Sequence, residues 1–386
     1  MSLLRLAATN LFRNPLRSGL TVTGVAIAVV TFLLLRTVIW AYNVAAEQAV
    51  PDRVVTRHKV TFIMMLPKRY IDEVRAIPGV RAATYSCWWG GKEPNHPDEF
   101  FATLAVDPET LVDVYDELRI DDGQLASWKE DRQGAIVGDL LAEKFGWKVG
   151  DTVNMESGIF PGQWQFHVSG TYETTRKTLD RQTFFFHWDY FNEMLPEDNK
   201  EMIGWISSRT EGNPSDVGRL IDARFDEKDV QTLSQDEATF QRSFLAGFSA
   251  ILFAIDTISV VILGIMALIL GNTVAMGVRE RTSEYGVLRA IGFQPRHIAT
   301  LVLGEALFLG FVGGLVGLLI AYPVVELGIG TWLEQNMSGF FPYFNVSPLN
   351  AALAISLAMG LAGGAAAFPA LQASRLNVID ALRRVA

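Results

Sequence analysis

Histidines and acidic clusters are the side chains in this sequence that could perform acid–base or metal chemistry. Five histidines are scattered without the i,i+4 spacing of a helical zinc pair: His58, His96, His167, His187 and His297. The sequence contains neither a G-x-S-x-G nucleophile motif nor a G-x-x-x-x-G-K-[ST] phosphate loop. Acidic runs such as Asp121-Asp122 are typical of solvated helix ends. We therefore expect a chain that is not an enzyme and binds no cofactor or metal itself.

Three charged residues lie inside long apolar segments and could form ion pairs there. They are Arg36, Asp256 and Glu305. A charge within a membrane segment is costly unless it is paired or reaches water. Arg36 and Asp256 should lie near the outer interface, where they either snorkel separately or pair with each other. Glu305 should face other helices or the preceding loop rather than lipid.

A short charged segment between two apolar segments has the pattern of an amphipathic helix. Its polar residues are Arg279, Arg281 and Glu284, and Tyr285, Leu288 and Ile291 form an apolar stripe at helical spacing. Gly292 should end this helix. Such a helix is either a plain membrane-surface element or a docking piece for a cytoplasmic partner.

Glycines at four-residue spacing predict close helix contacts. The pairs are Gly310 with Gly314, Gly313 with Gly317, and Gly360 with Gly364. Small residues at this spacing let two helix backbones approach closely in a membrane. The contacts could lie within one chain or between two copies.

Four apolar segments are long enough to position these residues across a membrane. A bilayer core of ~30 Å needs roughly 20 apolar residues in a helix. We therefore expect an α-helical membrane protein with four transmembrane helices plus a large extracytoplasmic α+β domain. The expected parts are an amphipathic N-terminal segment (1–19), first span and stalk (20–46), α+β domain (47–243), stalk and second span (244–278), cytoplasmic loop (279–297), third span (298–325), short outer loop (326–348), fourth span (349–371) and cytoplasmic tail (372–386).

Composition supports this division. The 386 residues are 49% hydrophobic with a net charge of −9. Residues 42–243 hold 35 acids and 22 bases, a net of −13, so that stretch is water-soluble while the rest is mostly apolar. An acidic soluble part excludes a nucleic-acid binder, and the apolar remainder excludes a soluble cytosolic enzyme. The single cysteine, Cys87, excludes an intramolecular disulfide and does not identify the redox compartment.

Charge asymmetry predicts the orientation. The segments 1–19, 279–297 and 372–386 hold 10 Lys or Arg, whereas 326–348 holds none. The positive-inside rule places both termini and the 279–297 loop in the cytoplasm. The first two spans are longer than the bilayer core is thick, so their outer ends should form a two-helix stalk.

The 47–243 segment alternates short strands and short helices. We expect a strand from Val54 to Met65, and a helix that Asp107 caps and Pro108 begins. A helix from Asp139 to Phe145 should end at Gly146. The aromatic runs Trp88-Trp89 and Phe184 to Phe186 are typical of buried core, although they could also line an apolar groove.

Several stretches resemble the permease subunits of MacB-like, or type VII, ABC transporters, which share the FtsX-like permease domain. These are RERTSEYGVLRAIG with the following GEALFLGFVGGLVG, NLFRNPLRSGLTVTGVAIAV near the start, GAIVGDLLAEKFGWKVGDTVNM in the centre and FPALQASRLNVIDAL at the end. The resemblance covers the whole chain. It implies that the helix at 279–291 is a coupling helix for a cytoplasmic ABC ATPase subunit. Arg279, Arg281 and Glu284 should then supply polar contacts to the ATPase and Tyr285 and Leu288 the apolar anchor, unless Tyr285 and Leu288 only pack against the chain's own spans. Without a phosphate loop, ATP and Mg should bind that separate partner.

The resemblance further implies two permeases per complex, as a homodimer or heterodimer, in the bacterial inner membrane. ATP-driven motion would reshape the outer domain to export or extract a lipid, lipoprotein, peptide or drug-like molecule. A periplasmic adaptor and an outer-membrane channel are possible further partners. Two alternatives stay open: an FtsX-like signalling scaffold that activates a cell-wall hydrolase, or one half of a lipoprotein-release heterodimer.

Overall fold

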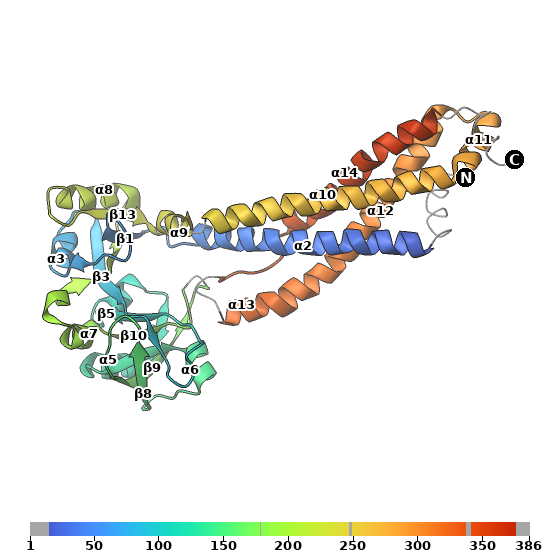
Figure 1. The fold of residues 1–386 in the computed structure, drawn as a ribbon. Helices are drawn as coiled ribbons and strands as arrows, with labels where there is room; N and C mark the ends of the chain where they lie inside the picture. Colours follow the sequence, from blue (N-terminus) through green and yellow to red (C-terminus); the bar gives the residue numbers. More distant parts are fainter. Residues whose placement is uncertain (1–14, 178, 247–248, 337–340, 376–386) are drawn as a thin grey trace. The chain divides into compact units, whose positions relative to one another are not determined.

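The computed structural model describes residues 15–177, 179–246, 249–336 and 341–375. These form two compact units, one from 1–41, 248–331 and 344–386, and the other from 42–247 and 332–343. The first unit consists of long apolar helices and the second is built around a sheet (Figure 1). The expected N-terminal segment before Pro15 and the tail after Arg375 lie outside the described residues.

The helical unit contains four helices that are long and apolar enough to cross a membrane, among the residues described. They are α2 (Pro15–Glu47), α10 (Ser249–Glu280), α12 (Pro295–Tyr322) and α14 (Pro348–Ser374). The short α11 (Thr282–Ala290) lies between α10 and α12, and α9 (Glu237–Ala246) precedes α10.

The third span differs from its predicted limits. Instead of ending at Val325, the helix continues through a π-helical segment, η2 (Pro323–Gly330), into α13 (Thr331–Asn336). Pro323 has no N–H to donate, and the wider π turn accommodates that missing bond without ending the helix. Half of the expected 326–348 loop is therefore helix.

Three of the predicted glycines form tight contacts of α12 with its neighbours. A Cβ on Gly310 would lie 2.7 Å from the Ala358 carbonyl oxygen of α14, and one on Gly317 would lie 2.7 Å from Val29 of α2. A Cβ on Gly313 would likewise lie 2.6 Å from the side chain of Val25 in α2. Because these approaches leave no room for a methyl group, α12 is packed directly against both helices.

The other three glycines are less constrained. A Cβ on Gly314 would make an ordinary contact of 3.4 Å with Ala358, while one on Gly360 or Gly364 would have no atom within 4 Å. Within the described chain, the close packing expected of Gly360 and Gly364 is therefore not made. Their open face stays available for a second copy or for lipid.

We predict that Gly317→Leu destabilises the helical unit, because the added side chain must displace Val29. Overpacking of this kind costs about 1–3 kcal/mol. Gly360→Leu is the matched control and should leave the unfolding temperature of the detergent-solubilised chain unchanged. Equal stability of the two variants would show that the α2–α12 contact does not hold the unit together.

The α+β unit is built on one long mixed sheet and a two-stranded one. The long sheet has the order β13-β1-β12-β3-β5-β10-β7-β9-β8-β4, with β6 paired to β9, and β11 pairs β2 separately. The strands are β1 (Arg53–His58), β2 (Leu66–Pro67), β3 (Val80–Trp88), β4 (Gly91–Lys92), β5 (Thr103–Val106), β6 (Leu118–Ile120), β7 (Gly134–Gly138), β8 (Thr152–Ser157), β9 (Trp164–Thr174), β10 (Phe184–His187), β11 (Met202–Ile203), β12 (Trp205–Thr210) and β13 (Thr232–Asp236).

Short helices connect these strands. They are α3 (Tyr70–Arg75), α4 (Leu111–Val114), α5 (Asp122–Glu130), α6 (Asp139–Phe145), α7 (Trp188–Met194), the 3-10 turn η1 (Glu197–Asn199) and α8 (Pro214–Phe225). The predicted helix at 139–145 is confirmed, and Gly146 ends it with a φ of +69°.

Two local predictions are wrong. The strand expected to reach Met65 ends at His58, whose ring accepts a hydrogen bond from the Val60 N–H and so supports a turn. Helix α4 begins at Leu111, later than expected, with Thr110 before it. Asp107 does act as a cap of the preceding turn, because its side chain accepts hydrogen bonds from the Glu109 N–H at 3.2 Å and from the Thr110 hydroxyl at 2.7 Å.

Aromatic residues fill the core of the α+β unit. Trp89 is fully buried, and its ring meets Trp164, Phe166 and Phe186 edge-on at centroid distances of 5.1–5.4 Å. Edge-to-face rings of this kind add to the free energy gained by burial. The aromatic runs seen in the sequence are therefore mainly core.

Candidate functional site

The turn between α10 and α12 carries the predicted docking helix. α11 starts after a break at Arg281, and the chain reverses at Gly292, whose φ of +103° favours glycine. Gln294 and His297 then cap the start of α12 reciprocally. The local sequence therefore fixes α11 as a separate short helix.

Two arginines connect α11 to the spans on either side. Arg281, at the start of α11, forms an ion pair with Glu305 of α12, with Nη1 and Oε1 2.6 Å apart. Arg289, at its other end, donates a hydrogen bond of 2.8 Å to the carbonyl of Ser374, the last residue of α14. Glu305 thus faces the α11 segment, as its position in the third span predicted. Arg281 and Arg289 therefore attach α11 to both α12 and α14.

The apolar side of α11 differs from the predicted one. Tyr285 is only 2% exposed and Leu288 is half-buried, so these residues pack inside the helical unit. The apolar residues that face outward are Val287, Ile291 and Phe293, which are 49%, 68% and 38% exposed. The helix is rotated relative to the sequence-based expectation because Arg281 and Arg289 are both held toward the spans.

The polar residues predicted to contact a partner differ in their exposure. Arg279, at the end of α10, is exposed, and Glu284 is half-exposed. Arg281 is committed to Glu305 and is only 16% exposed. Arg279 and Glu284 therefore remain candidates for polar contacts, while Arg281 positions the helix.

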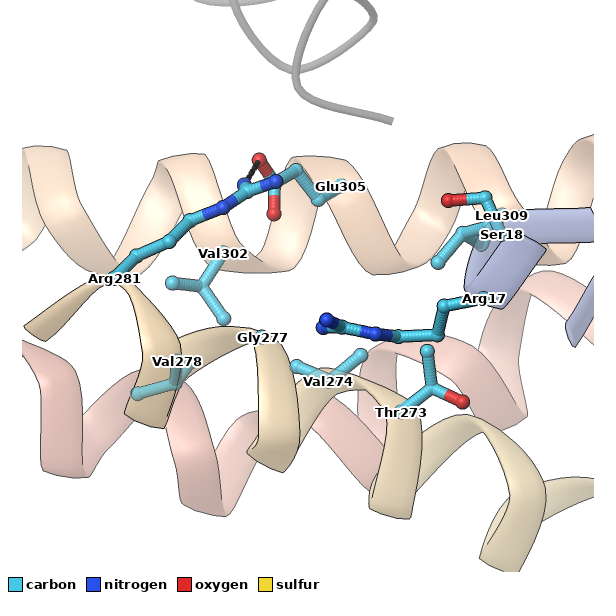
Figure 2. A pocket seen from close by; sticks show the side chains of 10 residues that line it. All are labelled: Arg17, Ser18, Thr273, Val274, Gly277, Val278, Arg281, Val302, Glu305 and Leu309. Carbon is cyan, nitrogen blue, oxygen red and sulfur yellow. Dashed lines mark hydrogen bonds and ion pairs between the residues drawn. The ribbon is translucent and has the colours of Figure 1, made fainter. Parts of the chain in front are cut away.

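A small polar cavity lies close to this ion pair (Figure 2). Its volume is about 50 Å³, enough for a few water molecules. The lining residues come from α2, α10 and α12 and from Arg281: Arg17, Ser18, Thr273, Val274, Gly277, Val278, Arg281, Val302, Glu305 and Leu309. Arg17 also pairs with Glu280, and the Thr21 and Thr273 hydroxyls are 2.9 Å apart. Polar contacts therefore join the ends of three spans.

Arg36 and Asp256 form an ion pair between α2 and α10. Nη1 and Oδ1 are 2.9 Å apart, and the side chains are 35% and 60% exposed. Of the two possibilities that the sequence left open, the structure has the paired one. The pair connects α2 and α10 at a point along these helices that is distant from the cavity.

Charge reversal tests this pair. We expect Arg36→Asp and Asp256→Arg each to lower the unfolding temperature of the solubilised chain by a few degrees, since a partly exposed pair contributes about 1 kcal/mol or less. The double variant restores an attractive pair and should recover most of the loss. If the loss of unfolding temperature in the double variant equals the sum of the losses in the two single variants, the contact contributes nothing to stability.

A buried ionic cluster lies where the chain enters and leaves the α+β unit. Arg53, the first residue of β1, is 2% exposed and lies 2.6 Å from Glu117 and 3.3 Å from Glu237, the first residue of α9. Glu237 also accepts a hydrogen bond of 2.9 Å from the Val50 N–H. Burial raises the pKa of the Glu237 carboxyl, and Arg53 opposes the rise. This Arg53 cluster joins the end of the first stalk segment to the start of the second.

Sequence reasoning missed the Arg53 cluster. Its three charged residues, at 53, 117 and 237, are 64 and 120 positions apart. Nothing in the neighbouring sequence distinguishes any of them from an ordinary surface charge. Strand pairing of β1 with β13 brings Arg53 and Glu237 together, and Glu117 comes from the turn between α4 and β6. No group of three or more His, Cys, Asp or Glu residues that could hold a metal ion occurs in the described ranges.

Comparison with known proteins defines the class of this chain. Residues 18–230 match the model of the MacB-like periplasmic core domain, and residues 257–378 match that of the FtsX-like permease C-terminal domain. Together with the four long apolar helices, these matches define a membrane protein of the ABC permease class with a large extracytoplasmic domain. The chain belongs to the MacB-like, type VII family of ABC transporter permeases, as its motifs indicated.

Individual relatives agree with this assignment. An uncharacterized ABC transporter permease of Methanocaldococcus jannaschii is 22% identical over 98% of this chain and 96% of its own length. The permease YtrF of Bacillus subtilis is 34% identical over 34% of this chain and 33% of its own. The macrolide export ATP-binding/permease protein MacB of Bradyrhizobium diazoefficiens is 29% identical over 44% of this chain and 24% of its own. The solved extracellular domain of YknZ, from Gram-positive bacteria, is 12% identical with a TM-score of 0.35, over 48% of this chain and 98% of that one.

Proposed function

We propose that this chain is the permease subunit of an ATP-driven transporter that converts ATP hydrolysis into motion of its extracytoplasmic domain. The observation that carries the proposal is the arrangement of α11. Val287 of this helix and, directly after its end, Ile291 and Phe293 are exposed, while Arg281 and Arg289 connect the helix to two spans. A partner that binds the outward face can thus move the helices rather than the loop alone.

The partner is a separate cytoplasmic ABC ATPase subunit that binds ATP and Mg²⁺. One comparison supports this assignment: the Methanocaldococcus jannaschii relative, which this chain matches over 96% of that protein's length, is named as an ABC transporter permease. The complex contains a second permease, either a copy of this chain or a related one. It lies in the bacterial inner membrane with both termini in the cytoplasm, in accord with the Lys and Arg bias of the short segments.

The transported molecule is exported or extracted on the outer side, and it is a lipid, lipoprotein, peptide or drug-like compound. A periplasmic adaptor and an outer-membrane channel would complete an efflux route. The sheet-based domain of about 200 residues supports this proposal because it is large enough to have a core of its own, with surface left over to contact such a molecule.

The decisive experiment is reconstitution of the chain with an ABC ATPase in lipid nanodiscs. We expect stable co-purification, stimulated ATP hydrolysis and an ATP-dependent change in the extracytoplasmic domain, measured by hydrogen exchange. An ATPase that neither binds nor responds to the permease would overturn the proposal. A domain that changes while no candidate substrate moves would point to signalling instead.

A further inference from the structure

An open pocket lies on the surface of the α+β unit, beside β4 at the end of the long sheet. Its volume is about 240 Å³, below the roughly 300–1,000 Å³ of pockets that enclose whole small molecules. A pocket of this size holds one group of a larger ligand. Its walls come from the β3–β4 turn and the loop that leads to β5, and they include Trp88, Gly90, Gly91, Lys92, Asp98 and Phe100.

Aromatic side chains form the apolar wall of this pocket. Trp88, the last residue of β3, is half-buried and stacks with Phe100 at a centroid distance of 6.0 Å and an interplanar angle of 21°. Phe100 and Ile159 are each 59% exposed. A Cβ on Gly90 would lie 2.9 Å from the Ile159 side chain, so Ile159 packs over the same turn. A single exposed apolar residue is ordinary, whereas three that gather at one pocket form a surface for an aromatic ring.

The loop that carries Phe100 is held in place before any ligand binds. The carboxylate of Glu93, which is 8% exposed, accepts a hydrogen bond of 2.7 Å from the Asn95 amide and lies 2.8 Å from Nδ1 of His96. At the other end of the loop, Phe101 is 3% exposed and its ring meets that of Phe145 at 5.4 Å. A preorganised loop loses little conformational entropy on binding.

Three polar groups surround the aromatic wall: the ammonium of Lys92, the carboxylate of Asp98 and the indole N–H of Trp88. Within the ranges that the structure describes, none of these three groups forms an ion pair or a hydrogen bond with the protein. The carboxylate of Glu99, by contrast, is paired with Lys144. The groups that would satisfy all three are a carboxylate, an ammonium and a carbonyl oxygen, and a peptide carries each of them. An acyl chain would leave all three unmatched.

We propose that this Trp88 pocket binds an aromatic side chain of a zwitterionic peptide. The ring packs on Trp88 and Phe100, the indole N–H donates to a peptide carbonyl, and Lys92 and Asp98 attract the two charges of the peptide. The inference rests on the proposed function, because it identifies the exported molecule as a peptide. It concerns residues of the α+β unit alone and requires no ATPase.

The test is saturation-transfer-difference NMR of the full chain in lipid nanodiscs, without ATPase or nucleotide, with empty nanodiscs as the blank. The probe is the tripeptide glycyl-phenylalanyl-glycine. Glycyl-leucyl-glycine lacks the aromatic ring, and the N-acetylated, C-amidated form of the probe lacks both charges. The variants are Phe100→Ala, Lys92→Gln and Asp98→Asn. Leu220→Ala is the matched control for Phe100→Ala, since Leu220 is 52% exposed in α8 of the same unit.

We expect the probe to bind with a Kd on the order of 1 mM, as for a ligand of fragment size. Phe100→Ala should raise this Kd about ten-fold, and Lys92→Gln and Asp98→Asn about three-fold each, while Leu220→Ala keeps the wild-type value. The leucine peptide should bind about ten-fold more weakly than the probe. The blocked peptide should bind more weakly too, and equally to wild type and to the Lys92 and Asp98 variants.

An absence of binding, an unchanged Kd in Phe100→Ala or equal binding of the leucine peptide overturns the Trp88 pocket. A loss in Phe100→Ala without any loss in Lys92→Gln and Asp98→Asn overturns its specificity for zwitterionic peptides. Because no ATPase is present, each of these results leaves the permease function standing. A chain that binds the probe as expected but neither binds nor stimulates an ATPase overturns the proposed function and leaves the peptide site.

Discussion

Replacing Ile291 by Asp should abolish co-purification of the permease with its ATPase while leaving the chain folded and inserted. Ile291 follows the end of α11 and is 68% exposed, so the substitution costs little within the chain. Truncation of an interface anchor typically costs ~2 kcal/mol or more, roughly a 30-fold loss of affinity, and a buried carboxylate adds to this. The measurements are pull-down with the ATPase and permease-stimulated ATP hydrolysis.

Two controls make the Ile291 result specific. Ile159→Asp introduces the same charge at a similarly exposed isoleucine, 59% exposed, in the α+β unit and should leave ATPase binding unchanged. Tyr285→Phe keeps the buried ring and should also bind normally. Full binding and activity of Ile291→Asp would place the docking surface outside α11.

Glu117→Ala should be the most destabilising single substitution in the extracytoplasmic domain. It removes the carboxylate 2.6 Å from the buried Arg53 and leaves that guanidinium with only Glu237 as a charged partner. Breaking a buried ion pair in this way costs about 3–5 kcal/mol, which lowers the unfolding temperature of a domain this size by roughly 10 °C. Thermal unfolding of the full chain, followed by tryptophan fluorescence of the domain, measures the loss.

The triple variant Arg53→Met, Glu117→Leu and Glu237→Gln separates charge from packing. It removes all three charges of the cluster, and the amide oxygen at 237 can still accept the Val50 N–H, so the triple variant should be more stable than Glu117→Ala alone. Asp216→Ala, which removes an exposed pair with Arg219, should change stability by no more than about 0.5 kcal/mol. If the Glu117→Ala and Asp216→Ala variants unfold at the same temperature, the Arg53 cluster does not stabilise the domain.

Much of the architecture was predictable because it depends on local composition. The four spans follow from runs of apolar residues, and the acidic stretch from Tyr42 to Ser243 identifies the water-soluble domain. The α11 segment was recognisable because Gly292 and Pro295 mark the boundaries between helices. Gly146 ended its helix as expected, since a left-handed residue is a local requirement.

Boundaries that depend on contacts were not predictable. The sequence suggested that the third span stops at Val325, but the helix that contains it continues through η2 and α13 to Asn336. Two features of this helix could not be recognised from the local sequence: the π turn that accommodates Pro323 and the pairing of Glu334 with Lys177. Each depends on chain segments far away.

The sequence by itself determined the class of protein, the number of long apolar helices and the position of α11. Only the tertiary structure decided which of the apolar residues there are exposed. Periodicity places Tyr285, Leu288 and Ile291 on one face, but Arg281 contacts Glu305 and Arg289 contacts Ser374. Tyr285 and Leu288 lie inward, while Val287 and Ile291 are exposed. The same holds for Arg53, Glu117 and Glu237. Hydrophobic patterning is a property of neighbours along the chain, whereas the pairing of charges depends on which distant residues the fold brings together.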